Sequence, residues 1–166
     1  MSAAAQPGEW VLLSYRVPRE PSRPRIAVWR ALKRLGVAQL GDGLVALPAD
    51  ARTREQLEWI ADDVIAAGGS AGVWLARPGT VKQEREIAAA MAQARTAEYE
   101  KVMADAQAAS STPTAAELRR LRGELRRITR RDYFPPAARD VAEAAVTALA
   151  AALADQPSGT PEAARP

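Results

Sequence analysis

Residues 9–17 read EWVLLSYRV, and the interpretation of the rest of the chain depends on this run. Its aliphatic, β-branched and aromatic side chains predict a strand, and a proline follows it directly. Both alternating sets of side chains are apolar, with Val11 and Leu13 on one side and Trp10 and Leu12 on the other. Because a strand of this kind is buried on both faces, its sheet needs a cover on each side.

The segments that follow alternate between helix and strand. Apolar spacing predicts a helix from Ser22 to about Leu35 and a second helix that contains Leu57 and Val64. Ser22 is the expected cap of the first helix. Short apolar runs predict three further strands, at residues 37–40, 44–47 and 70–76.

This β-α-β-β-α-β order is typical of the ferredoxin-like fold, an α+β architecture with a four-stranded sheet and both helices on one face. The bare motif leaves the other face open, and we expect either the helical extension or a second subunit to cover it. The alanine-rich remainder predicts three helices, at about 80–109, at 114–131 and from Pro135 onward. The predicted divisions are a flexible N-terminus (1–8), a ferredoxin-like domain (9–79), an arginine-rich helical extension (80–155) and a disordered tail (156–166).

Composition excludes several kinds of chemistry. The chain has neither cysteine nor histidine, which removes disulfides, thiolate nucleophiles and the preferred ligands of most zinc and iron sites. Metal-dependent nucleases of the ferredoxin-like class place an aspartate at the end of the first strand, where this chain has Arg16, and an arginine repels Mg²⁺. Asp62 and Asp63 are consecutive on a helix and point about 100° apart, which makes a poor metal pair. We expect no enzyme activity, no metal and no cofactor.

The sequence carries no membrane or export signal that we can identify. No apolar stretch approaches the roughly 20 residues that a membrane span needs. The N-terminus also lacks the charged and apolar regions of a signal peptide. We therefore expect a cytoplasmic protein.

Positive charge is concentrated in two segments, although the formal net charge is only +3. In the predicted helix at 114–131, arginines at helical spacing flank an apolar stripe, and the first helix has a similar basic row. The candidate nucleic-acid-binding residues are Arg23, Arg30, Lys33, Arg34, Arg119, Arg122, Arg126 and Arg130. Guanidinium groups match phosphate oxygens bidentately, so these rows favour an anionic partner. Two plainer interpretations stay open: a solvated face, or arginines that pair with acidic residues of neighbouring helices.

Several short segments occur in a characteristic order and spacing. They are Trp10-Val11-Leu12-Leu13, Val28-Trp29-Arg30, Leu35-Gly36, Leu47-Pro48, Glu58-Trp59, Gly68-Gly69, Ala97-Glu98-Tyr99 and Asp132-Tyr133-Phe134. In these segments the chain resembles the N-terminal domain of ChrB-type chromate resistance proteins, over roughly residues 9–150. The pattern is also similar to the Cas2-like module of PaaX-type repressors.

The resemblance implies a DNA-binding transcriptional regulator linked to chromate resistance. Arg30, Lys33 and the arginines of 119–131 match basic positions of the family pattern. Full-length members carry a further C-terminal domain, which we expect this chain to lack, so a separate chain of that type is an expected partner. The other expected partners are DNA and a second copy of this chain, with which it would form a homodimer. The alternative is a dimeric interaction protein that docks on a partner chain without binding DNA.

Overall fold

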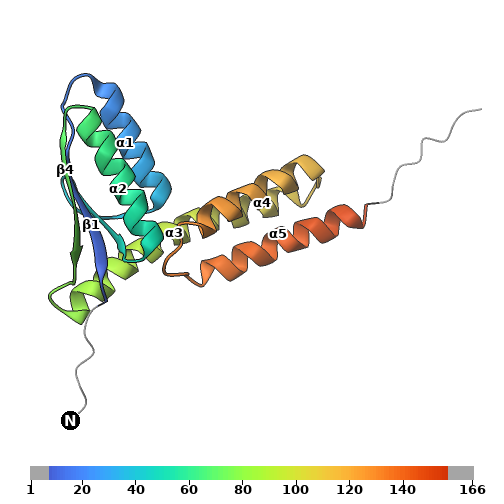
Figure 1. The fold of residues 1–166 in the computed structure, drawn as a ribbon. Helices are drawn as coiled ribbons and strands as arrows, with labels where there is room; N and C mark the ends of the chain where they lie inside the picture. Colours follow the sequence, from blue (N-terminus) through green and yellow to red (C-terminus); the bar gives the residue numbers. More distant parts are fainter. Residues whose placement is uncertain (1–7, 157–166) are drawn as a thin grey trace, which may run out of the picture. The chain divides into compact units, whose positions relative to one another are not determined.

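The computed structural model describes residues 8–156, and the chain is a mixed α+β protein, as predicted (Figure 1). Apart from Gly8 and Gln156, the predicted flexible N-terminus and disordered tail lie outside these residues. The strands are β1 (Trp10–Arg16), β2 (Ala38–Gly41), β3 (Leu44–Pro48) and β4 (Ser70–Ala76). The helices are α1 (Ser22–Leu35), α2 (Ala51–Ala66), α3 (Val81–Ala109), α4 (Ala115–Thr129) and α5 (Ala138–Ala154).

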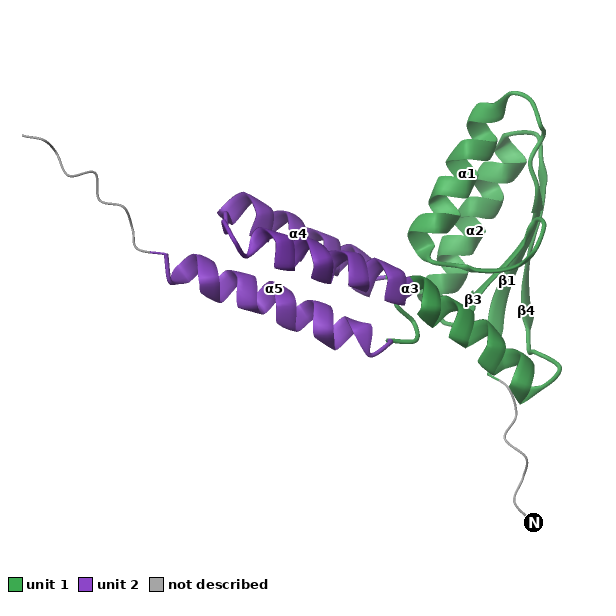
Figure 2. Cartoon of the chain, turned by 180° about the vertical axis from the view of Figure 1, so that it is seen from behind, with its two compact units in different colours: residues 1–94, 131–135 green, residues 95–130, 136–166 purple. Residues whose placement is uncertain are grey.

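Two compact units divide the chain (Figure 2). Unit 1 comprises residues 1–94 and 131–135, and unit 2 comprises residues 95–130 and 136–166. We predicted a boundary at residue 79, whereas unit 1 extends into α3. The reason is packing, because Ile87 and Met91 of α3 belong to the core of unit 1, as do Tyr133 and Phe134. In the part of the chain that the structure describes, no helix is both long and apolar enough to cross a membrane.

The sheet of unit 1 is antiparallel throughout and has the strand order β2-β3-β1-β4. α1 and α2 lie side by side on one of its faces (Figure 1). Val11 and Leu13 of β1 are fully buried in one core with Leu32 of α1 and Leu57 of α2. The alternation that predicted this strand therefore reflects a core beneath the two helices.

The second face of the sheet is covered at one end by unit 1 itself. Trp10 is 3% exposed, and its ring stacks on Phe134 with 5.9 Å between the ring centroids. Its indole N–H donates to Glu84 Oε1 at 3.1 Å. Glu84 and Phe134 both belong to the segment 80–155 that we predicted as a helical extension. At this end of the sheet, the extension therefore covers the second face, which is one of the two alternatives that the sequence left open. Trp74 shares this face, since it pairs with Leu12, but remains 59% exposed.

The helix starts depart from the predictions in detail. Ser22 does not cap α1, because the N-cap position is held by Pro21 and no side chain accepts from the helix there. α2 has a capping box that we did not predict. In it, Asp50 Oδ1 accepts the Thr53 N–H at 2.7 Å, and Thr53 Oγ1 accepts the Asp50 N–H at 3.0 Å.

Replacing Asp50 by alanine should lower the free energy of unfolding by about 1 kcal/mol, because the first turn of α2 loses an acceptor. The Thr53 N–H holds the pKa of the Asp50 carboxyl below its ordinary value. Because this pKa is lower in the folded protein than in the unfolded chain, the ionised carboxylate stabilises the fold at pH values above the unfolded-state pKa of about 4. This stability is lost as the pH falls through the folded-state pKa. Urea unfolding at pH 7 and pH 3 should therefore show the larger Asp50→Ala deficit at pH 7.

The matched control is Asp50→Asn, which keeps an accepting oxygen but cannot titrate. We expect this variant to stay close to the parent at pH 7. An Asp50→Ala protein as stable as the parent at both pH values would contradict the role of the box.

Candidate nucleic-acid interface

The apolar stripe predicted for α4 is buried in unit 2. Leu118, Leu121 and Ile128 are at most 7% exposed and pack with Tyr99 of α3 and Leu149 of α5. Thr114 caps this helix, since its Oγ1 accepts the Glu117 N–H at 3.2 Å. With the stripe fixed against two other helices, the intervening arginines are held on the outer side of α4.

One set of these arginines is paired with carboxylates. Arg120 contacts Glu117 Oε1 at 2.6 Å and Asp105 Oδ2 of α3 at 3.1 Å. Arg127 pairs with Glu124. The hydrogen bonds to Glu117 and Asp105 raise the pKa of Arg120 further, and the bond from Arg120 lowers the pKa of Glu117. Of these contacts, the one between Arg120 and Asp105 fits the interpretation of pairing with an acidic residue of a neighbouring helix, and the other two are pairs within α4.

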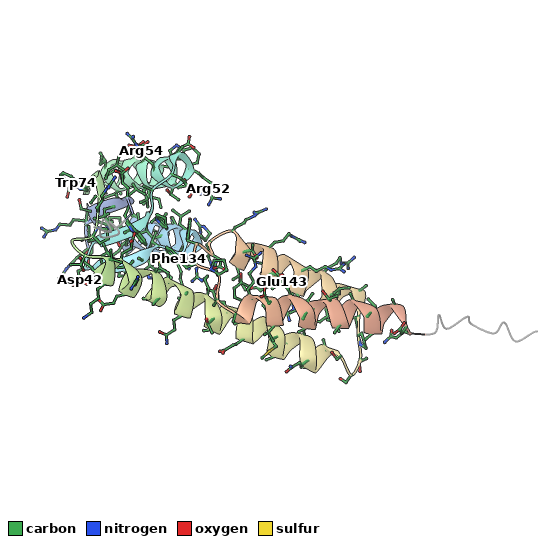
Figure 3. All side chains as sticks on the ribbon, turned by 90° about the horizontal axis from the view of Figure 1, so that it is seen from below. Asp42, Arg52, Arg54, Trp74, Phe134 and Glu143 are labelled. Carbon is green, nitrogen blue, oxygen red and sulfur yellow. The ribbon has the colours of Figure 1, made fainter. Side chains whose placement is uncertain are left out.

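A second set lines an open groove between α4 and α5, with a volume of about 560 Å³. Arg122, Arg126 and Arg130 line it from the α4 side, and Arg139 lines it from α5. Glu143, labelled in Figure 3, is the sole acid among the described residues of the lining. It accepts from Arg139 Nε at 2.9 Å. We call this feature the arginine groove.

The three α4 arginines of the groove differ from their neighbours in charge balance. Arg122, Arg126 and Arg130 are exposed, and none takes part in an ion pair within residues 8–156. Their four-residue spacing sets them about one turn apart, over roughly 12 Å of helix axis. Leu125 and Val146 add apolar surface to the same lining. The arrangement can hold a row of anionic oxygens, because each guanidinium can donate two parallel hydrogen bonds.

The structure divides the row that we predicted on α4. Arg119 is exposed but does not line the groove with the other three. Arg139 was missed because it lies on a different helix, where no basic row surrounds it. Only the packing of α5 against α4 brings it to the site.

The basic residues predicted on α1 form a second surface, within unit 1. Val28 and Leu32 of α1 face the core, and the predicted residues are exposed. They are Arg23, Arg30, Lys33 and Arg34. Trp29 is 56% exposed between them, and Lys33 Nζ lies 4.7 Å from the centre of its ring. Cationic side chains around an exposed ring are typical of surfaces that bind nucleic-acid strands.

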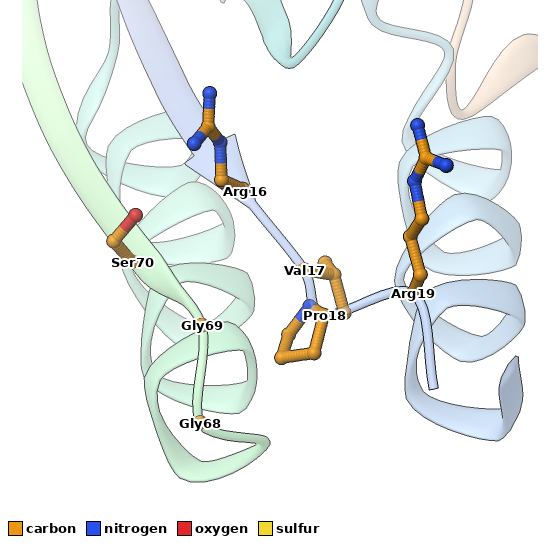
Figure 4. Close-up of a pocket in the computed structure, with 7 residues that line it drawn as sticks. All are labelled: Arg16, Val17, Pro18, Arg19, Gly68, Gly69 and Ser70. Atoms are coloured by element: carbon orange, nitrogen blue, oxygen red, sulfur yellow. The ribbon is translucent and has the colours of Figure 1, made fainter. Parts of the chain in front are cut away.

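A hollow of about 620 Å³ lies where β1 ends and β4 begins (Figure 4). Arg16 and Arg19 line it, together with Gly68 and Gly69, and the two arginine side chains extend in the same direction. Within residues 8–156, no cluster of carboxylates is suited to a metal ion. The two charged side chains that line the hollow, Arg16 and Arg19, are both cationic.

Comparison with known proteins identifies the family. The family model described as "Protein ChrB, N-terminal" matches residues 25–112, just over half of the chain. Searches of curated proteins and of solved structures give no significant match. The matched range includes Arg30, Lys33 and Arg34 of α1 but not Arg23, and it ends before α4. The resemblance deduced from the short sequence segments is thus confirmed. The chain belongs to the ChrB family of chromate-resistance-related proteins, and the match is to the N-terminal domain of that family.

Proposed function

We propose that this ChrB-type chain is a DNA-binding regulatory module and that the arginine groove contacts the phosphate backbone of DNA. The observation that carries the proposal is the contrast within α4. Arg120 and Arg127 are neutralised by nearby carboxylates, whereas Arg122, Arg126 and Arg130 have no such partners among the described residues.

The energetics favour phosphate as the occupant of the groove. Three cations within about 12 Å of helix axis repel one another, so neutralisation by an anionic strand lowers their mutual free energy. Binding to duplex DNA also releases condensed counterions, which supplies sequence-independent affinity. Because guanidinium groups matched to phosphates carry no sequence information, these contacts position the protein on DNA and do not specify a site.

The exposed cations of α1 are the second surface in the proposal. Trp29 offers a ring on which an unpaired base can stack, and Lys33 lies 4.7 Å from its centre. Arg30 and Lys33 lie within the residues that match the family model. We assign this surface an auxiliary role, because its cations lie on the exposed side of a single helix.

We further infer that unit 1 is ferredoxin-like and acts by binding and not by catalysis. The β-α-β-β-α-β element order, with α1 and α2 on one face of the sheet, supports the first inference. Arg16 and Arg19 at the end of β1 support the second, because their charge disfavours a divalent cation there.

Changing Arg122, Arg126 and Arg130 together to glutamine should weaken binding to a random-sequence DNA duplex. At roughly 1.5 kcal/mol for each charge-assisted contact, the loss is on the order of 1,000-fold. The fold should persist, because the buried stripe of α4 is unchanged. Fluorescence anisotropy with a labelled duplex measures the affinity, and circular dichroism confirms the helix content.

The matched control changes Arg120 and Arg127 to glutamine. These residues lie on the same helix but already hold carboxylate partners, so we expect only a small loss of affinity. Equal losses in the two variants would show that binding responds only to total charge. An unchanged affinity in the triple variant would reject the groove as the binding site.

A further inference from the structure

Trp74 presents its indole ring to solvent on the second face of the sheet in unit 1. The side chain is 59% exposed, and its N–H donates to Ser14 Oγ of β1 at 3.0 Å. A Cβ at Gly72 would lie 3.1 Å from Trp74 Nε1, so the ring leans along β4 over a residue that has no side chain. The hydrogen bond and the space over Gly72 thus fix the ring in one position, while much of its surface stays accessible.

The strand register sets a cationic residue next to this ring. β1 and β4 pair Ser14 with Gly72, and Arg16 with Ser70. Alternate residues of a strand share a face and are roughly 7 Å apart, so Arg16 and Ser70 lie one step beyond the ring on the same face. Tyr15, which comes between, packs against the core under the opposite face, as this alternation requires.

Two adjoining hollows connect the ring to two cations. A hollow of about 330 Å³ is lined by Trp74, and the hollow of about 620 Å³ at the strand end is lined by Arg16 and Arg19. Ser70 lines both hollows, so they adjoin. Among residues 8–156, neither lining includes an acid, and neither arginine takes part in an ion pair. The surface therefore offers an aromatic ring at one end and positive charge at the other.

We propose that this face of unit 1 binds single-stranded nucleic acid, with one unpaired base stacked on Trp74 and the adjacent phosphates against Arg16 and Arg19. Every base has a flat π-face, so an aromatic ring stacks on an unpaired base whatever its identity. Guanidinium groups donate paired hydrogen bonds to phosphate oxygens. In a duplex the bases are stacked on one another, so their faces are not available to the ring. The combination of ring and cations therefore selects a single strand.

Charge and side-chain size favour a nucleic-acid strand over a protein partner on this surface. Between the ring and the cations, the face carries Ser14, Gly72 and Ser70, which leave room for a base and its sugar. The centre of a protein interface is instead built from large apolar side chains. The two arginines complement a polyanion. This site belongs to unit 1 and the arginine groove belongs to unit 2, so the inference does not rest on the proposed binding of duplex DNA.

The affinity for a labelled short oligothymidine strand, measured by fluorescence anisotropy, tests the stacking contact. The starting protein is the full chain with Arg122, Arg126 and Arg130 changed to glutamine, so that the arginine groove does not dominate the signal. Trp74→Ala should weaken binding roughly 5- to 150-fold, which is the range for stacking of one base on an aromatic side chain. Trp74→Phe keeps an aromatic ring and should recover most of the affinity. Both variants should stay folded, because the side chain is more than half exposed.

Two other exposed tryptophans supply the controls. Trp59 of α2 is 62% exposed and lies outside this face, so Trp59→Ala should bind the strand like the starting protein. A loss of affinity in Trp29→Ala with none in Trp74→Ala would place the strand on α1 and overturn the proposal. So would a duplex that competes as strongly as the single strand. If sedimentation equilibrium shows that Trp74→Ala dissociates an oligomer, a second copy covers the ring, and the proposal is again overturned.

Changing Arg16 and Arg19 together to glutamine tests the phosphate contacts. Both side chains are exposed, so the variant should stay folded, which circular dichroism checks. Each phosphate contact with a single strand contributes about 0.7 to the slope of log affinity against log salt concentration, so the slope should be flatter by about 1.4. Arg54 already pairs with Glu58 on α2, so Arg54→Gln should keep the slope of the starting protein. An unchanged slope in the double variant would contradict the proposed contacts.

Discussion

Gly69→Ala should be among the most destabilising single changes in this chain, with a loss of more than about 3 kcal/mol in the free energy of unfolding. A Cβ at Gly69 would lie 2.3 Å from the backbone oxygen of Arg16 and 2.8 Å from Val64 Cγ1. Relief requires the end of β1 and the end of α2 to move apart. At this chain length, the change corresponds to a melting temperature lower by roughly 10 °C.

The neighbouring glycine supplies the control. Gly68 is labelled beside Gly69 in Figure 4. Its φ is +81°, but nothing lies within 4 Å of a Cβ built there. Gly68→Ala therefore carries only the left-handed backbone strain, about 1–2 kcal/mol. All four tryptophans lie in unit 1, so tryptophan emission during thermal unfolding reports on this unit. Equal losses for the two alanine variants would contradict the close approach at Gly69.

Tyr99→Ala should destabilise unit 2 by about 3–5 kcal/mol, because it removes a large aromatic side chain from the core. Tyr99 is fully buried on α3, in a cluster with Leu121 of α4 and Leu149 of α5. The arginine groove depends on the packing of α4 against α5, so DNA affinity should fall with helix content.

Two probes separate the units in the Tyr99→Ala protein. We expect the far-ultraviolet helical signal to fall at lower urea than the tryptophan emission, which comes from unit 1 alone. Tyr99→Phe, which keeps the ring, should unfold much closer to the parent. A single transition at the parental midpoint would show that the aromatic core of unit 2 contributes little.

The elements of the fold could be predicted because their signals are local. The apolar alternation of Val11 and Leu13 marks β1, and the stripe of Leu118, Leu121 and Ile128 marks the buried side of α4. Period and spacing are properties of a single segment, so they need no knowledge of its neighbours. The cap of α4 is local in the same sense, because Thr114 accepts from the N–H of Glu117, three residues further along the chain.

The contacts that join distant segments could not be predicted in this way. The stacking of Phe134 on Trp10 assigns the 131–135 segment to unit 1, and nothing in either segment alone indicates that pairing. The cap of α2 was missed because its signal, Asp50 followed by Thr53, is short and common. Ser22 had the chemistry of a cap, but Pro21 occupies the position.

The candidate site shows the same division between local and distant information. Spacing identified the arginines of α4, but it could not separate those that form ion pairs with carboxylates from those that form none among the described residues. The separation depends in part on Asp105, which reaches Arg120 from α3. Arg139 enters the groove from α5, so it too required the tertiary packing.

The dependence of DNA affinity on salt tests the central claim, phosphate contact by the arginine groove, most directly. Each phosphate that an arginine neutralises contributes about 0.9 to the slope of log affinity against log salt concentration. The variant with Arg122, Arg126 and Arg130 changed to glutamine should therefore show a slope flatter than that of the parent by about 3. The Arg120→Gln and Arg127→Gln control should keep the parental slope. Identical slopes for the parent and the triple variant would contradict the claim.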